Sequence, residues 1–576
     1  MPLSLETIST PVLILGGGTG ALGAALQCAR SGTKCLLVTP GAWVGGMLSA
    51  SGVSAPDGNE LSPWQTGLWG ALLRQLRQQV PQGLDQNWVS CFGFQPGQAE
   101  EIFQGWLAAE PNLQWRSGMN LEKLNRLGNR LVEAIFSDPN SQLQVKFDLI
   151  IDGTELAESL ALAGIKHRFG WEPKEQWNEP SAPPMQQLKQ DPFFTAQPVQ
   201  SPTWVVIGKW KGSLVGNQFI PQLKQANPPF NDCLNPHGLL RTLSYGHLPQ
   251  NWLMLNWPKA GNDWHQDPGA PFSGSKVRIS EHRAAMQNHS LDFLNELQVI
   301  SNGLLQPANA FPSNQAGGCL ALQAYWRESR RLIGACTVIE QDLLPNQKNK
   351  LNSKNSIAVG NYPNDHHYPG ADWPLAPKSI PWGGRWSGTP FCIPFDCLYG
   401  AEISNLLMAD KGISVSHIAN GATRLGPLIL NIGQAAGMAA ALCSRGGLLP
   451  ADIKVSQIQQ NLINDQKAPL GPFILEDLPW HSSNWRDQQM AALNENSKTC
   501  SPLAPPSEPG EQAQIMELNI KAEDQWLGYW DGIEWPLISL EPLVKMQMAN
   551  LHGKRITALG RWNPWGPWWR INQLLL

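Results

Sequence analysis

The sequence of 576 residues lacks an excess of charge of either sign. Its 42 lysine and arginine residues nearly balance 46 aspartate and glutamate residues, so the net charge is −4 at pH 7, and the pI is about 6.3. Nucleic acids and anionic lipid surfaces are recognised by a broad cationic field, which this composition does not supply. We therefore expect no nucleic-acid partner.

Long apolar runs are also missing. The start of the chain carries Glu6 and no basic segment, and glycines interrupt its apolar residues before they reach the length of a signal peptide. The most apolar window, residues 425–442, is broken by glycine, proline and amide residues, whereas a spanning helix needs about 20 largely apolar residues. We expect a cytoplasmic protein with no membrane span.

Cysteine pairs and metal-ligand spacings are absent as well. The ten cysteines include no C-x-x-C pair and no zinc-type Cys/His spacing, and a chain of this length does not need disulfide staples. Asn364, Asp365, His366 and His367 form a polar cluster, but adjacent histidines on a loop rarely ligate one ion. We expect reduced thiols and no metal, and His366 is interpreted as a catalytic or substrate-binding residue.

The beginning of the chain has the pattern of a nucleotide-binding unit. Residues 11–15 predict a strand, residues 21–30 an alanine-rich helix and residues 35–38 a second strand. At 576 residues and 42% hydrophobic composition, the chain is long enough for more than one domain around this unit.

The turn inside this unit reads G-x-G-x-x-A, with Gly16, Gly18 and Ala21 at the three specified positions and Gly20 beside them. Its glycines permit a tight turn and a close approach to a pyrophosphate, which the N-terminus of the following helix then faces. The turn therefore predicts a dinucleotide site.

The end of the second strand bears on which dinucleotide binds. Thr39 stands where an acid usually accepts hydrogen bonds from the ribose, and its hydroxyl is able to make one such bond. Gly45 and Gly46 form a further backbone turn where an FAD pyrophosphate and ribityl chain would pass, which favours FAD over NAD. Residues 205–216 have the wrong spacing for a second G-x-G-x-x-G, so no NAD(P)H domain is visible and the electron acceptor is unknown.

Two later segments resemble known flavoprotein motifs. Residues 147–152 predict a strand ending in an acid, and the following D-G-T-E resembles the strand-terminal D-A-T-G motif of FAD-dependent oxidoreductases with the glutathione-reductase-like fold. Residues 393–437 look like the closing FAD motif of that superfamily: a strand at residues 406–409, a small polar turn, then a helix whose N-terminus faces the flavin.

With GGGTGALGAA, GAWVGGML, LNWPKAGND and YWRESRR in the same order, the chain resembles the bacterial FAD-dependent oxidoreductases, relatives of the fumarate-reductase and thiazole-synthase flavoproteins, up to about residue 445. The resemblance implies non-covalently bound FAD and a small-molecule substrate. The residues expected to bind FAD are Gly16, Gly18, Gly20, Ala21, Thr39, Gly45, Gly46, Met47, Asp152, Gly153, Thr154, Thr423 and Gly433.

The expected fold class is α/β, with a discontinuous Rossmann-like FAD-binding domain, an inserted α+β substrate lobe and a small β-rich C-terminal module. The FAD-binding domain is expected at residues 5–52, 128–164 and 394–445, and the substrate lobe at residues 165–393. Residues 446–511 are expected to form a helical extension and a proline-rich linker, and residues 512–576 a tryptophan-rich β module.

The tryptophans of that module allow two interpretations. They suit a carbohydrate or partner surface, or, more commonly, the core or docking face of a small β module. They are Trp526, Trp530, Trp535, Trp562, Trp565, Trp568 and Trp569.

Four residues are candidates for the chemistry. His417, just before the closing helix, would remove a substrate proton or hydrogen-bond the flavin. Arg424, expected at the start of that helix, would stabilise the reduced flavin or clamp a carboxylate. Arg327 lies on a probable helix with Arg331 on the same face, facing an acidic substrate or solvent. His366 completes the set, and Asn262 and Asp263 are further candidates for substrate binding.

Three function classes follow. The first is an FAD-dependent oxidoreductase that takes a hydride from a small or medium organic substrate. The alternatives are a non-redox flavoenzyme, such as an isomerase or hydratase, and a non-catalytic nucleotide-binding protein. The spectrum and flavin content of the protein distinguish them.

Overall fold

The computed structural model describes residues 4–212, 226–235, 237–258, 260–312, 317–345, 353–495 and 503–575. Its central sheet has the strand order β3-β2-β1-β6-β5-β4, and β17 pairs with the free edge of β6. The parallel strands are β1 (Ser4–Leu15), β2 (Cys35–Thr39), β3 (Leu113–Ser117), β6 (Ser141–Asp152) and β17 (Leu406–Met408). β4 (Asn120–Leu127) and β5 (Arg130–Ser137) form an antiparallel meander with β6.

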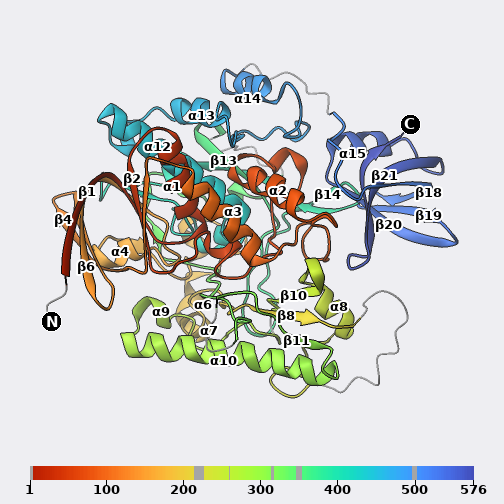
Figure 1. Ribbon diagram of the computed structural model, residues 1–576, viewed down its shortest axis with the longest axis horizontal. Coiled ribbons are helices and arrows are strands. Elements are labelled where there is room, and N and C mark those ends of the chain that lie inside the picture. The colour runs from red at the N-terminus through yellow and green to blue at the C-terminus, as the bar shows by residue number, and fades with distance from the viewer. Residues whose placement is uncertain are drawn as a thin grey trace.

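Short apolar runs form these strands because both faces of the sheet are covered. β2 is buried along its whole length, which is typical of a parallel strand between helical layers. One cover is α1 (Thr19–Arg30), and α12 (Gly426–Gly446) packs against it (Figure 1). Among the described residues, α12 is the one helix long and apolar enough to cross a membrane, and 94% of its most apolar window is buried inside the protein.

Glycines bring α1, α12 and β17 into close contact. A Cβ at Gly20 would lie 1.7 Å from the carbonyl oxygen of Ala409, and a Cβ at Gly433 would lie 2.1 Å from the carbonyl oxygen of Gly20. Residues 4–30 and residues 406–446 therefore form one packed unit, although 375 residues separate them in the chain. α2 (Gly67–Gln79) and α3 (Pro96–Ala108) pack beside them.

A second layer is built from the middle of the chain. Its antiparallel sheet has the order β11-β8-β10-β9, and α10 (Lys276–Ile300) runs along it, at the lower edge of Figure 1. The strands are β8 (Val206–Trp210), β9 (His247–Leu248), β10 (Trp252–Leu255) and β11 (Leu305–Pro307). The segment 205–216 begins in β8, and its last four residues lie outside the described residues.

Three two-stranded ribbons and several short helices complete the body. The ribbons pair β7 (His167–Arg168) with β12 (Arg331–Leu332), β13 (Ser356–Asn361) with β16 (Pro390–Pro394), and β14 (Ser379–Trp382) with β15 (Arg385–Gly388). The helices are α4 (Glu158–Leu162), α5 (Lys174–Trp177), α6 (Met185–Gln190), α7 (Phe193–Ala196), α8 (Gly238–Ser244), α9 (Ala270–Ser273), α11 (His417–Thr423), α13 (Val455–Ile463) and α14 (Trp485–Leu493).

The C-terminal segment forms a closed barrel with the strand order β18-β19-β20-β22-β21. Its elements are β18 (Gln512–Ala522), β19 (Gln525–Trp530), β20 (Ile533–Ser539), α15 (Pro542–Met548), β21 (Arg555–Asn563) and β22 (Trp568–Leu574). The third and fifth strands pair in parallel and a helix joins the third to the fourth, an arrangement that matches the Greek-key barrel of the OB type.

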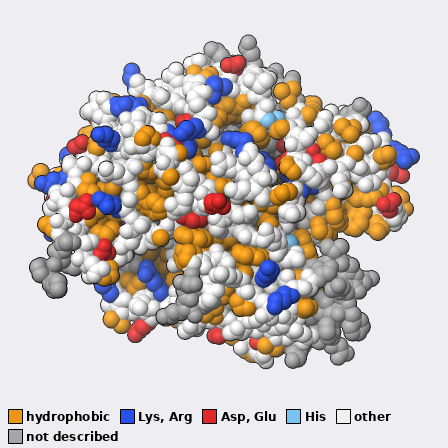
Figure 2. All heavy atoms as spheres, viewed as in Figure 1, with side chains coloured by type: hydrophobic (Ala, Val, Ile, Leu, Met, Phe, Trp, Pro, Cys, Tyr) orange, Lys and Arg blue, Asp and Glu red, His pale blue; other side chains and the backbone are white. Residues whose placement is uncertain are grey.

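The tryptophans of the tail serve both the core of this barrel and its attachment. Trp526 and Trp569 are buried in its core. Trp565 stacks on His247 of the body at 4.4 Å between ring centroids, and the Trp568 indole donates to Asp85. On the face shown in Figure 2, acidic and basic side chains are intermixed over body and barrel alike.

Candidate active site

A cleft of about 560 Å³ lies at the carboxyl ends of β1 and β2, across the N-terminus of α1. Its volume is in the range of small-molecule and cofactor sites. Gly16, Gly17 and Gly18 line it, and Gly16 has φ +93°, the left-handed region that glycine tolerates. The first turn of α1 carries no acidic residue of its own, and a helix N-terminus favours an anion, although the N–H of Gly20 is already bonded to Asp410.

The charges around the cleft suit a diphosphate joined to sugars. Arg283 and Arg330 supply positive charge, and Glu155 and Glu158 supply carboxylates that accept hydrogen bonds from hydroxyl groups. Burial, and then the charge of Asp152, raises the pKa of Glu158 to about 7. The residues present therefore fit a dinucleotide cofactor.

Thr39 does not play the part expected of it. Its hydroxyl donates to the carbonyl oxygen of Gly41 at 2.7 Å and accepts from the Trp115 indole at 3.0 Å, and the residue is fully buried. Because both hydrogen bonds stay within the protein, this hydroxyl is not available to a ribose. Glu155 and Glu158, which follow β6, are the carboxylates that line the cleft.

Three of the residues expected to bind the cofactor line the cleft: Gly16, Gly18 and Thr154. The other ten do not line it. They are Gly20, Ala21, Thr39, Gly45, Gly46, Met47, Asp152, Gly153, Thr423 and Gly433. Asp152, for example, accepts from the backbone N–H groups of Thr154 at 2.8 Å and Ser159 at 2.9 Å, so it holds the loop that presents Thr154 to the cleft.

A buried ion cluster that the sequence did not reveal supports the glycine turn. Asp410, two residues after β17, accepts from the backbone N–H of Gly20 at 3.0 Å. The Lys411 ammonium lies 2.9 Å from Asp410 and also pairs with Glu155. Burial opposes the charge of Lys411, but the two carboxylates outweigh it and raise its pKa above the ordinary value.

A chain of alternating positive and negative side chains connects the candidate residues Arg327 and Arg424. Arg327 lies 3.0 Å from Asp263, whose other oxygen lies 2.7 Å from Nδ1 of His367. His367 Nε2 lies 2.8 Å from Asp365, which also pairs with Arg424 at 3.1 Å. Burial and Arg327 oppose protonation of His367, but Asp365 and Asp263 outweigh them and raise its pKa.

Asp365 is the most accessible member of this chain of charges. Its partners Arg424 and His367 keep 2% and 12% of their side chains accessible, whereas Asp365 keeps 39%. Asp57 lies nearby: burial, reinforced by the charges of Glu60 and Asp365, raises its pKa to about 8. Asp57 was not among the sequence candidates, because an acid between Pro56 and Gly58 looks like ordinary turn chemistry.

A second chain of hydrogen bonds contains the two histidine candidates. His417 Nδ1 lies 2.7 Å from Glu328 and its Nε2 lies 2.6 Å from the Tyr368 hydroxyl. That hydroxyl lies 3.1 Å from Nδ1 of His366, whose Nε2 lies 3.0 Å from the Ile418 carbonyl oxygen.

One proton assignment satisfies all of these contacts. Burial raises the pKa of Glu328 to about 7 and lowers the pKa of His366 to about 3, and burial followed by the charge of Arg331 lowers the pKa of His417. A protonated Glu328 then donates to a neutral His417, and donation continues through Tyr368 and His366 to Ile418. Since every ring nitrogen is bonded within the protein, both histidines are placed to position their neighbours rather than to meet a substrate.

Two expectations about the arginines were wrong. Residues 325–331 form no helix, and Arg327 and Arg331 are buried in ion pairs, Arg331 with Glu172 at 2.9 Å. Arg424 caps the C-terminus of α11 and precedes α12 by two residues, so it does not start the closing helix.

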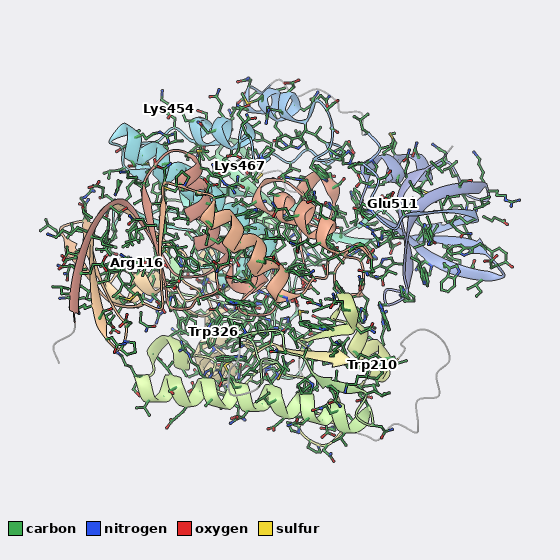
Figure 3. The ribbon with its side chains drawn as sticks, viewed as in Figure 1. Arg116, Trp210, Trp326, Lys454, Lys467 and Glu511 are labelled. Atoms are coloured by element: carbon green, nitrogen blue, oxygen red, sulfur yellow. The ribbon has the colours of Figure 1, made fainter. Side chains whose placement is uncertain are left out.

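Residues 322–331 form an extended segment, here called the strap, which lies between the cleft and the two chains of polar contacts. Ala324, Trp326 and Arg330 line the cleft, whereas Tyr325 and Arg327 face the other side, where Tyr325 bonds Arg424. Side chains of an extended segment alternate between its two faces, so one strand-like segment serves both sites. Figure 3 shows Trp326 between the central sheet and the layer built on α10.

Comparison with known proteins agrees with this geometry. The family model described as FAD dependent oxidoreductase matches residues 11–462, a range that contains both glycine turns, the strap and both charged chains. The chain belongs to the FAD-dependent oxidoreductase family. FAD is the cofactor that the cleft fits. Among its described residues, no group of three or more His, Cys, Asp and Glu side chains is placed to hold a metal ion.

No curated protein matches this oxidoreductase, but solved structures do. A flavin-dependent brominase is 9% identical, with a TM-score of 0.34, over 76% of this chain and 80% of that one. The myxobacterial chondrochloren halogenase is 8% identical, with a TM-score of 0.34, over 78% and 77%. The L-proline dehydrogenase from P. horikoshii is 12% identical, with a TM-score of 0.16, over 26% and 23%, so this chain spans about a quarter of its length.

Proposed function

We propose that this oxidoreductase takes a hydride from a small or medium organic substrate held beside the accessible carboxylate of Asp365. FAD, bound without a covalent link in the cleft, supplies the hydride acceptor. The observation that carries the proposal is the strap of residues 322–331, because one of its faces lines the cleft and the other holds the charged residues that include Asp365. The inserted layer of residues 165–393 then serves as the substrate lobe.

Asp57 is the proton acceptor in this proposal. It makes no hydrogen bond to the described residues that would occupy its carboxylate, and a Cβ on its neighbour Gly58 would lie 3.1 Å from Leu425, the residue before α12. As the substrate C–H bond breaks and its electron pair leaves with the hydrogen, the O–H or N–H proton passes to Asp57. A pKa of about 8 keeps Asp57 available for proton exchange near neutral pH.

Arg424 orients the substrate. Its guanidinium is held by Asp365 and by the Tyr325 hydroxyl, so its fork is fixed before a substrate arrives. His417, His366 and Arg327 are positioning residues in this proposal: they hold their neighbours in place and do not contact the substrate. The surrounding buried side chains exclude water, which strengthens each of these interactions.

The first test is a visible spectrum of the purified protein, with chromatography of the chromophore released by heat, followed by anaerobic addition of candidate substrates. We expect released FAD and bleaching by the substrate. Product formation without bleaching would instead favour the non-redox flavoenzyme, and failure to take up FAD would favour a non-catalytic nucleotide-binding protein.

The role of Asp57 is tested by the Asp57→Asn variant. The bleaching rate of the wild type should rise with pH around 8, and the variant should bleach about 100-fold more slowly and lose this pH dependence. Glu523→Gln, on the exposed turn after β18, is the control and should leave the profile unchanged. An unaltered profile in Asp57→Asn would exclude Asp57 as the acceptor.

A further inference from the structure

A second pocket, of about 270 Å³, shares no lining residue with the FAD cleft. It lies where α2, the proline-rich linker and the barrel meet. Arg74 and Arg77 of α2 line one side, and Trp480 and His481 lie beside them. Pro505, Pro506 and Pro509 of the linker, with Leu540, give the pocket an apolar wall. In Figure 3 the label Glu511 marks the place where the linker enters the barrel next to the body.

All but one of the charged groups in this pocket are paired. Glu508 lies 3.0 Å from Arg77 and 2.7 Å from Arg570, and Arg570 also lies 3.2 Å from Asp85. His481 Nε2 lies 3.0 Å from Glu541. Each of these side chains therefore already has a polar partner.

Arg74 is the exception. Within the described part of the chain, its guanidinium has neither an ion pair nor a hydrogen bond, and it lies over the Trp480 ring at 4.9 Å from the centroid. Burial, and then the charge of Arg77, lowers the pKa of Arg74 to about 10. A partly buried cation without a counter-ion is costly, and an anion that enters the pocket would remove that cost.

We propose that this pocket binds a small organic monoanion, whose carboxylate pairs with the Arg74 guanidinium held against Trp480 and whose apolar part packs on the linker prolines. One negative charge balances the one uncompensated arginine. The planar guanidinium stacked on the indole leaves its N–H fork free for a bidentate contact. The volume admits a single ring with its acid group and excludes a dinucleotide.

The pocket also borders the loop that carries Asp57. Gln65 lines the pocket, accepts a hydrogen bond from Arg77 at 3.0 Å and donates to the carbonyl oxygen of Glu60 at 2.5 Å. Glu60 is three residues from Asp57. The pocket lining is therefore connected through Arg77 and Gln65 to the backbone of the loop that carries Asp57.

The test is calorimetric titration of the full-length, FAD-loaded protein with benzoate, and with benzamide as the neutral analogue of the same shape. We expect one benzoate site, with benzamide at least about tenfold weaker. Arg74→Gln should weaken benzoate at least about tenfold, whereas the matched control Arg555→Gln, on the exposed start of β21, should stay within about twofold.

Several results would overturn the proposal. These are no benzoate binding to the wild type, equal binding of benzamide, and undiminished binding to Arg74→Gln. The last of these, together with a shift of the flavin absorption band, would place the benzoate in the FAD site instead. If Arg74→Gln does not fold, Arg74→Lys keeps the charge without the fork, and wild-type affinity in that variant would contradict a bidentate site.

Discussion

Burial raises the pKa of Asp57 from its ordinary 3.8 to about 8, and this shift makes the stability of the fold depend on pH. Between about pH 4 and 8 the carboxyl is ionised in the unfolded chain but protonated in the folded protein. The unfolded state then binds fewer protons, so the free energy of unfolding falls as the pH rises through this window. Asp57→Asn should flatten this decline, which urea denaturation at pH 5 and pH 8 will measure. An equal decline in the variant would mean that Asp57 is not buried as described.

Lys411 shows how a single cation supports the cofactor cleft. Replacing it by methionine leaves the buried carboxylates of Asp410 and Glu155 without a counter-charge, which should cost about 3–5 kcal/mol of unfolding free energy. Urea denaturation measures this loss, and Lys554→Met at an exposed position is the control. A loss equal to that of the control would contradict the cluster.

The sequence predicted some of these residues and not others. Gly16, Gly18 and Thr154 follow from local spacing, and their place in the cleft depends on short segments of the chain. Asp57, Glu328 and Asp410 act through partners that lie far away in the chain. An isolated acid in a loop carries no signal of such a partner, so a single sequence cannot distinguish it from a solvated one.

At the scale of elements, the C-terminal ends of the buried strands were predicted well, although β1 and β6 begin seven and six residues before the predicted strands. The first helix and second strand were placed within two residues of α1 and β2, and the closing strand within one residue of β17. Residues 325–331 were expected to be helical because arginine and glutamate favour helices. In the structure each of these long side chains finds a buried partner on a different element, and this tertiary pairing outweighs the intrinsic helix propensity.

The contact between α1 and β17 can be tested at Gly20. A Cβ there would overlap the Ala409 carbonyl oxygen, so Gly20→Ala should cost about 3 kcal/mol of unfolding free energy and weaken FAD retention during gel filtration.

The matched control for that variant is Gly105→Ala in α3. A Cβ at Gly105 meets no atom within 4 Å, so this substitution should stabilise the protein by about 0.5–1 kcal/mol. Equal effects at the two glycines, measured by urea denaturation, would contradict the close approach of α1 and β17.

At the scale of the whole molecule, the barrel is tied to the body by charge. Arg570 of β22 lies 3.2 Å from Asp85, and burial raises the pKa of that carboxyl while Arg570 opposes the shift. We expect the wild type to unfold in one calorimetric transition and Arg570→Leu to show a separate, earlier transition of the barrel. Arg555→Leu, on the same barrel but exposed, should keep the single transition. A single transition in both variants would mean that the ion pair between Arg570 and Asp85 does not hold the barrel to the body.

Composition indicated a β-rich tail, but not its closure. The barrel closes through the parallel pairing of β20 with β22, which joins strands that are not neighbours in the chain. Such pairings depend on the whole module, whereas hairpins such as β18–β19 depend on a local turn.

The late return of β17 and α12 has a consequence for synthesis of the protein on the ribosome. α1 packs against α12, and the free edge of β6 pairs with β17. Until about residue 446 has emerged, α1 and this edge of β6 are therefore not both covered. At ~5–20 residues per second, the nascent chain would hold an apolar helix face and an open strand edge for roughly half a minute. We expect ribosome-bound chains that end before residue 406 to recruit chaperones and to resist proteases poorly, and chains that extend beyond residue 462 to become protected.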